Sequence, residues 1–190
     1  MLNHQRYQFN DDEWGLVHGA CEKFAREELE TTKNQRFRRN QYNLEKMVMD
    51  NIVGKIGEWA VCFQCWKEGH NCSEPDMEIY TSSGKSFDAD LILEGQDMHV
   101  KSQSVESAER YGTSWTFQKG GRGYGHTDPI ISEGGGYGIF TVVDLRNKCV
   151  DIYGPLTTEE VRDKLRDPKL ERLKATKTCL YLEDFKILEL

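Results

Sequence analysis

Two long stretches near the N-terminus carry apolar residues at the three- and four-residue spacing of an amphipathic helix. The first covers residues 11–31 and opens with an acidic turn, and the second covers residues 42–68. The basic stretch 33-KNQRFRRNQ-41 joins them. The pattern therefore predicts two helices with a basic connector. Gly54 and Gly57, inside the second helix, indicate close packing or a kink.

The rest of the chain has the short apolar runs and turn signals that are typical of strands. We expect strands over residues 77–81, 87–93, 98–102, 114–118, 137–145 and 149–154. The glycine-rich stretch 119–136 predicts a loop. A capped helix is expected at 157–165, and the C-terminal region favours a helix and then a strand at 179–190. This order predicts an α/β domain in which a central mixed β-sheet is flanked by helices.

The length and the charge of the chain narrow the class of protein. A chain of 190 residues fits one α/β core over residues 42–190, with residues 1–41 as an N-terminal helical extension. The formal net charge of −7 argues against indiscriminate nucleic-acid binding and leaves room for a local basic groove. No apolar run approaches the roughly 18 residues of a membrane span, and the polar N-terminus lacks a signal-peptide pattern. We expect an intracellular, cytoplasmic protein with no membrane partner.

Four possible soft metal ligands lie close together near the end of the second predicted helix. Cys62, Cys65, His70 and Cys72 fall within eleven residues and could hold zinc. Their spacing matches no zinc knuckle or ribbon, and the first two lie inside a predicted helix. Cysteines in such positions pack as small apolar residues. We favour core and loop cysteines and keep zinc as the alternative.

The stretch 86-SFDADLILEGQDMHVKSQS-104 contains the strongest candidate chemistry in the chain. Folded as a hairpin about Gly95 and Gln96, it places Asp90 opposite Lys101. Because alternate residues of a strand share a face, one side of the hairpin is apolar. The other side gathers two carboxylates, an imidazole, an ammonium group and an amide, from Asp88, Asp90, His99, Lys101 and Gln103. A solvated strand face with an Asp–Lys pair is the plain alternative.

This hairpin resembles the core of the PD-(D/E)xK nuclease superfamily, which has the restriction-endonuclease-like fold. The resemblance covers residues 50–120 and rests on the segment from Asp90 to Lys101, on the upstream helix 54-GKIGEWAV-61, and on the element order around the hairpin. It implies hydrolysis of DNA phosphodiester bonds with Mg²⁺, or Mn²⁺, as cofactor. It also implies catalytic roles for Asp90, His99, Lys101 and Glu58, and a metal site made by Asp90, Glu58, His99 and the Val100 carbonyl.

His99 departs from the family pattern, which has Glu or Asp at this position. Mg²⁺ prefers oxygen ligands, whereas Mn²⁺, iron and zinc accept imidazole more readily. Three interpretations stay open: His99 is a working ligand or base, the site is degenerate and binds DNA without cutting it, or His99 replaces an original glutamate. Lys101 would orient the attacking water or stabilise the developing charge on the phosphate.

A nuclease also needs groups that contact the phosphates of DNA. The candidates are Arg36, Arg38 and Arg39 before the second helix, Lys119 and Arg122 in the glycine-rich loop, and Gln103 on the hairpin. A solvated charge run and a plain surface loop are the alternatives. We expect a site-specific endonuclease of restriction, homing or phage type that acts on double-stranded DNA as a homodimer. Two other classes remain open: an inactive DNA-binding module on the same fold, and an acidic interaction or anti-restriction protein.

Overall fold

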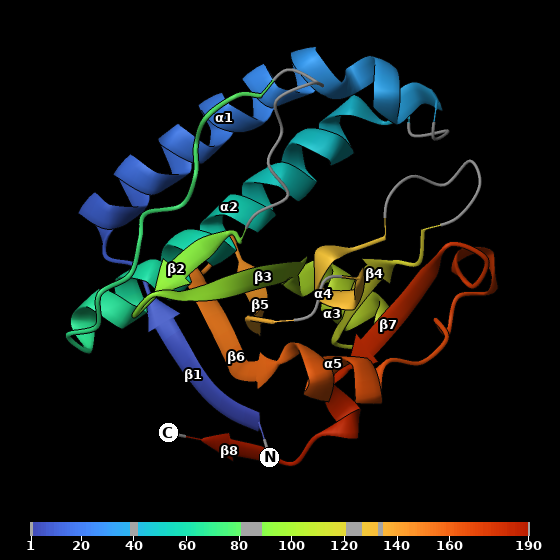
Figure 1. Cartoon of the computed structure of the whole chain (residues 1–190). Helices are drawn as coiled ribbons and strands as arrows, with labels where there is room; N and C mark the ends of the chain where they lie inside the picture. The colour runs from blue at the N-terminus through green and yellow to red at the C-terminus, as the bar shows by residue number, and fades with distance from the viewer. Residues whose placement is uncertain (1, 39–41, 81–88, 121–126, 133–134, 190) are drawn as a thin grey trace.

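A six-stranded mixed sheet forms the centre of the molecule (Figure 1). The computed structural model describes residues 2–38, 42–80, 89–120, 127–132 and 135–189. The strand order is β2-β3-β5-β6-β1-β8, with β3–β5 and β1–β8 parallel and the other neighbours antiparallel. The strands are β1 (Leu2–Gln8), β2 (Leu91–Leu93), β3 (Gln96–Ser104), β5 (Tyr137–Asp144), β6 (Cys149–Thr157) and β8 (Ile187–Glu189).

Different layers cover the two faces of the sheet. Helix α2 (Leu44–Lys67) packs on one face and carries α1 (Asp11–Arg38) on its outer side (Figure 1). On the other face lie a two-stranded sheet and three short helices: β4 (Ser114–Gln118), β7 (Lys177–Tyr181), α3 (Val105–Tyr111), α4 (Pro129–Ser132) and α5 (Thr158–Lys164). Val143 of β5 belongs to the α2-side core, and its neighbour Val142 belongs to the core on the other face. The protein therefore has a helical layer of α1 and α2, the central sheet, and a layer made of the two-stranded sheet and the short helices. This arrangement confirms the expected mixed α/β architecture.

Helix α2 approaches the sheet closely at one of its two glycines. A Cβ atom at Gly57 would lie 2.2 Å from Oγ of Ser102 on β3 and 2.6 Å from Oγ1 of Thr141 on β5. A Cβ atom at Gly54 would meet nothing within 4 Å. Gly57 therefore lets the helix backbone pack directly on the two strands, whereas Gly54 has no such role. Asn43 caps the start of the helix by accepting a hydrogen bond from the Lys46 N–H group.

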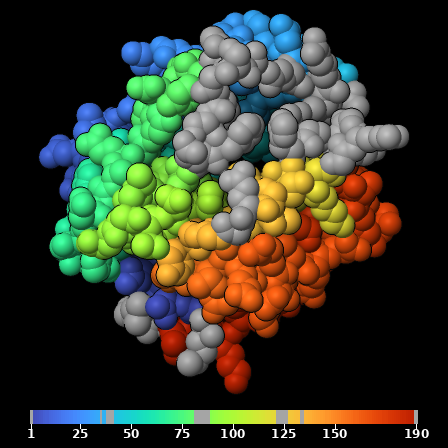
Figure 2. All heavy atoms as spheres, viewed as in Figure 1, coloured from blue at the N-terminus to red at the C-terminus, as the bar shows by residue number. Residues whose placement is uncertain are grey.

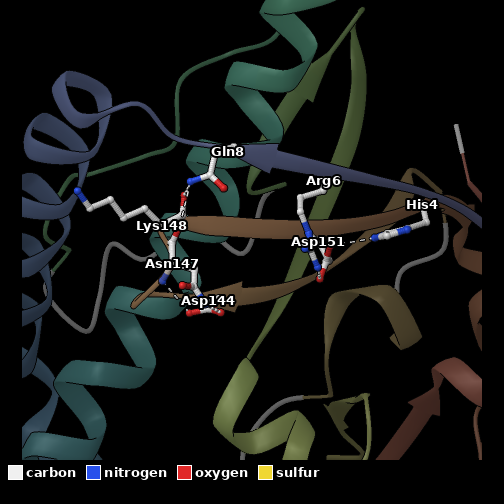
Figure 3. Close-up of polar contacts among 7 residues, drawn as sticks. All are labelled: His4, Arg6, Gln8, Asp144, Asn147, Lys148 and Asp151. Atoms are coloured by element: carbon white, nitrogen blue, oxygen red, sulfur yellow. Dashed lines mark hydrogen bonds and ion pairs between the residues drawn. The ribbon is translucent and has the colours of Figure 1, made fainter.

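Residues 2–8 form an inner strand of the sheet, which corrects the helical expectation for that part of residues 1–41, whereas residues 11–38 are helical. Strand β1 lies between β6 and β8, and its polar residues are held by polar partners on β6. Asp151 accepts hydrogen bonds from Arg6 at 2.7 and 2.8 Å and contacts Nε2 of His4 at 3.0 Å (Figure 3). At the far end of the strand, Gln8 donates to the carbonyl groups of Asn147 and Lys148 (Figure 3).

Other boundaries differ from the sequence expectation as well. Helix α1 continues to Arg38, through most of the expected basic connector. Residues 77–80 form no regular structure, so the strand expected there is wrong over those residues. A four-residue helix, α4, lies inside the segment expected to be a loop. The C-terminal region has 3₁₀ turns at Glu171–Leu173 and Leu182–Asp184, with strand β7 between them.

Several predicted elements are confirmed closely. Strands β4, β5 and β6 begin where expected, and α5 begins with a capping box in which Thr157 and Glu160 bond each other's backbone. No helix of the described ranges is long and apolar enough to cross a membrane.

Candidate functional site

The β2–β3 hairpin has a different register from the one expected. Its turn is Glu94-Gly95, with φ of 49° and 77°, the positive values that a two-residue type I′ hairpin turn requires. Leu91 consequently pairs with Met98, whereas the expected fold about Gly95 and Gln96 paired it with Val100. The strand is thus shifted by two residues relative to its partner, which preserves the faces but changes the neighbours.

Asp90 lies at the edge of β3, at the point where β2 begins. Its N–H group donates to the Met98 carbonyl, although Leu91 is the residue paired with Met98. Asp90 and Leu91 therefore both lie opposite Met98, as in a β-bulge. A bulge of this kind changes the direction of a side chain at the edge of a paired strand. The carboxylate of Asp90 accepts a hydrogen bond of 2.8 Å from the Val100 N–H group. Asp90 is held by the backbone of β3 and not by Lys101.

An acidic cavity of about 380 Å³ opens beside Asp90 and runs along one side of α2. Among the residues that the structure describes, its charged lining has one cation, Lys55, and six carboxylates, those of Glu28, Asp50, Glu58, Asp76, Glu78 and Asp90. Asn51, Gly54, Lys55 and Glu58 recur at three- and four-residue steps, so they occupy one side of the helix. The cavity therefore brings together two residues of the expected site, Glu58 and Asp90.

Glu58 is the most unusual carboxylate of this cavity, because only 7% of the residue is exposed. Its Oε2 atom accepts a hydrogen bond of 2.7 Å from Nζ of Lys55, which itself lies 5.2 Å from the ring centroid of Phe24. Burial raises the pKa of Glu58 to about 8; Lys55 opposes this shift, and the charge of Asp90 adds to it. A buried carboxylate with a strongly perturbed pKa in a cavity is a functional-site candidate on physical grounds.

His99 and Lys101 lie on the opposite face of β3 from α2. Met98 and Val100 are buried against Val61 of α2, so strand alternation turns the residues between and beyond them the other way. There, Nζ of Lys101 forms an ion pair of 2.7 Å with Asp128 and lies 5.9 Å from the ring centroid of Phe117. The four residues expected in one site are therefore divided: Glu58 and Asp90 share a cavity, and His99 and Lys101 do not line it.

A second cavity, of about 510 Å³, lies along the neighbouring side of α2. Within the described part of the chain, its lining cations are Lys46, Lys101, Lys169 and Arg172, and its one lining carboxylate belongs to Asp50, which also lines the acidic cavity. In the space-filling view, teal atoms of α2 are visible deep in this face of the molecule (Figure 2). We call these two spaces the acidic cavity and the basic cavity.

Of the described residues that were expected to contact DNA, Arg36 and Lys119 line neither cavity, and Gln103 lines the basic cavity. Arg36 is half-buried, and its guanidinium group is bonded to Glu28 and Asn51. Gln103 lines the basic cavity, but its amide is bonded to the backbone of Gly112 and Ser114. Lys119 pairs with Asp167 at 2.9 Å. Arg39 and Arg122 lie outside the described residues, as do the Arg38 side chain and Asp88.

The cysteine group near the end of α2 belongs to the core. Cys62, Cys65 and Cys72 are buried in one apolar cluster with Leu91 and Met98, which confirms the core interpretation. Burial raises the pKa of each of the three thiols, which opposes the thiolate form that zinc requires. Across the described ranges, no three His, Cys, Asp or Glu side chains are grouped so that they could hold a metal ion.

Several residues of the two cavities were not singled out from the sequence. Lys55 and Asp76 were missed in the acidic cavity, and Lys46 and Arg172 in the basic one. The i, i+3 spacing of Lys55 and Glu58 was a readable signal, whereas the approach of residues 168–173 to α2 has no local signature. Comparison of the chain with protein-family models, with curated proteins and with solved structures gives no match.

Proposed function

We propose that the protein is a metal-dependent phosphodiesterase that acts on DNA, with Glu58 and Asp90 as its metal ligands. One observation carries this proposal: a buried carboxylate on α2 and a carboxylate fixed at the edge of β3 line the same cavity. Mg²⁺ is commonly held by one or two carboxylates and completes its shell with waters and substrate phosphates. The oxygen donors of Glu58 and Asp90 match this chemistry, and Mn²⁺ fits it too. Burial raises the pKa of Glu58 to about 8, so a metal bound there at neutral pH would have to displace its proton.

The chain's own residues divide the work in a way that differs from the family pattern. A bound divalent ion would lower the pKa of a water and stabilise charge on the phosphate. Lys55, whose ammonium group lies 2.7 Å from Glu58, is the cation placed to neutralise developing charge in this cavity. Lys55 thus takes the role that the resemblance gives to Lys101, and His99 has no place among the ligands.

The finer fold assignment belongs to the same proposal. Helix α2, the β2–β3 hairpin and α3 come in this order along the chain, and β5, which follows β4 and α4, pairs with β3 in parallel. This order supports a restriction-endonuclease-like core, on which the sequence resemblance also rests. The homodimer and the cytoplasmic location stay predictions.

The test is cleavage of supercoiled plasmid DNA in Mg²⁺ or Mn²⁺ by the full chain and by three variants. Asp90→Asn and Glu58→Gln remove the proposed ligands with almost no change of shape. Glu68→Gln changes an exposed carboxylate at the C-cap of the same helix and is the matched control. We expect the control to cut as the unaltered chain does, and each ligand variant to lose about 100-fold or more of the rate. Equal cutting by all four proteins would refute the metal site.

A second candidate is a DNA-binding module without catalytic activity. The observation that favours it is the separation of His99 and Lys101 from Glu58 and Asp90 by strand β3. This candidate predicts DNA binding that is equal in a chelator and in Mg²⁺, and no cleavage by any variant. An acidic interaction protein predicts neither binding nor cleavage at low salt.

A further inference from the structure

The basic cavity gathers positive charge in a protein whose formal net charge is −7. Four cations from three separate parts of the chain line it: Lys46 on α2, Lys101 on β3, and Lys169 and Arg172 in the segment before β7. Cations that converge from distant parts of a fold make a local field that a scattered surface does not make. Lys46, Lys101 and Lys169 are paired with Asp50, Asp128 and Glu183 in the free protein, so an anionic ligand would bind Arg172 and compete with these carboxylates for the three lysines.

Its polar wall includes the edge of strand β3. Lys101, Ser102, Gln103 and Ser104 all line the cavity, although alternate side chains of a strand point to opposite faces. Four consecutive lining residues mean that the edge of the strand, and not one face, borders the space. Among the described residues, strand β2 pairs with residues 96–98 of β3 and does not extend along residues 101–104. Further hydroxyl groups are contributed by Ser107, Ser114 and Thr116.

The size and rim of the cavity narrow the kind of anion. A volume of about 510 Å³ lies within the range of pockets that enclose small molecules, so it suits one or two nucleotides and not a whole duplex. Tyr111 lines the cavity with 37% of the residue exposed, and the Arg110 guanidinium carbon lies 5.1 Å from the centroid of its ring. Exposed aromatic rings beside a basic groove are the usual means of holding unpaired bases.

The basic cavity also leads toward the proposed metal ligands. Asp50 lines both cavities, and Lys101 directly follows Val100, whose N–H group binds Asp90. A nucleic-acid strand bound along the basic cavity would therefore place a neighbouring phosphate near the acidic cavity. We propose that the basic cavity binds a single-stranded segment of nucleic acid, with its phosphates on Lys46, Lys101 and Arg172 and a base on Tyr111. This inference rests on the proposed function and defines the form of its substrate.

The test measures binding without cleavage, in EDTA, by fluorescence anisotropy. The probes are a labelled oligo(dT) of about 12 nucleotides and a hairpin duplex with the same number of phosphates. Unlabelled oligo(rU) competes in a second arm and tells DNA from RNA as the source of the strand. The charge-reversed variant Lys46→Glu/Arg172→Glu changes two exposed residues of the cavity. Lys23→Glu/Arg26→Glu reverses one lysine and one arginine on the exposed side of α1 and is the matched control.

We expect the unaltered chain to bind the single strand more tightly than the duplex. The cavity variant should weaken single-strand binding by about tenfold or more, and its plot of log K against log salt should be shallower by about 1.4, since each single-strand phosphate contact contributes about 0.7. Tyr111→Ala should weaken binding and leave the salt dependence unchanged. Equal losses in the cavity variant and the control, or tighter binding of the duplex, would overturn the inference. Because EDTA removes the metal, the result is independent of the cleavage assay.

Discussion

The two cavities along α2 lie side by side and have opposite charge. Among the described residues, the cavity on one side of α2 is lined by six carboxylates and one lysine. The cavity on the adjacent side is lined by four cations and one carboxylate. Asp50 lines both cavities. Under the two proposals above, one helix would serve two kinds of ligand, a cation on one side and an anionic nucleic-acid strand on the other.

The two cavities also differ in how exposed some of their charged side chains are. Glu58 and Lys55 of the acidic cavity have side chains that are 9% and 15% exposed, and they form a close ion pair. Lys46 of the basic cavity is 66% exposed, and its pair with Asp50 is of the kind that contributes little to stability. The pair of Lys55 and Glu58 is thus fixed against the core, although Asp76 and Glu78 of the same cavity are exposed, whereas Lys46 of the basic cavity lies at the surface.

The largest expected effect separates the two lysines that could assist cleavage. Lys55→Met should lower kcat for DNA cleavage by about 100-fold, because it removes the cation beside the metal ligands. Lys101→Met should raise KM and lower kcat by less than about tenfold, since Lys101 lines only the basic cavity. Steady-state kinetics on an oligonucleotide substrate measure both constants. A larger fall in kcat for the Lys101 variant would restore the family assignment.

A second pair of variants tests whether close packing at Gly57 fixes both cavities. Gly57→Ala should destabilise the fold by about 1–3 kcal/mol, because its Cβ atom meets Ser102 and Thr141. Gly54→Ala, one helical turn away, should stabilise it by about 0.5–1 kcal/mol, since its Cβ atom has open space. Urea denaturation gives both free energies of unfolding. Equal values for the two variants would mean that α2 does not rest on the strands at Gly57.

The third prediction concerns Asp151, which lies away from both cavities and tests folding alone. Burial works against ionisation of Asp151, but hydrogen bonds from Arg6 and His4 hold its pKa below the usual range. A lowered pKa contributes stability above the unfolded value of about 3.9, and this stability is lost as the pH falls through the folded value. Asp151→Asn should therefore cost about 1 kcal/mol at neutral pH and little in acid. A cost that does not change with pH would contradict this origin.

The smallest effect is expected at His99, where the family pattern predicts a large one. His99→Glu restores the family residue but places a carboxylate on the face of β3 away from Glu58. We expect neither Mn²⁺ affinity nor cleavage to change by more than about twofold, a difference of roughly 0.4 kcal/mol. Calorimetric titration and the plasmid assay measure the two quantities. A gain of cleavage in this variant would return His99 to the site.

Strong periodic patterns made most of the architecture readable from the sequence. Helix α2 and strands β4, β5 and β6 follow from their apolar spacing, and α5 follows from its capping residues. Strand β1 was missed because only Leu2 and Tyr7 of its seven residues are buried, which is too few for an alternating apolar pattern. Arg6 and His4 are satisfied by Asp151, which lies far away in the sequence.

The candidate site could be predicted only in part from the sequence, because of the local backbone conformation at Glu94 and Asp90. Glu94 adopts a positive φ of 49°, a conformation that no sequence pattern assigns to glutamate, and this moves the hairpin turn. The register shift follows from that turn and preserves the faces of the strands. The bulge at Asp90 is a separate feature, and it redirects the Asp90 side chain. The sequence therefore named Glu58 and Asp90, but it grouped them with His99 and Lys101, which face the other way.

The most direct test of the metal site is a calorimetric titration of Mn²⁺ into the full chain and into Asp90→Asn, Glu58→Gln and Glu68→Gln. We predict a single site in the unaltered chain and in the Glu68 variant, and loss of that site in each of the other two variants. Binding that survives in both Asp90→Asn and Glu58→Gln, or no binding by the unaltered chain, would contradict the assignment of the acidic cavity as a metal site.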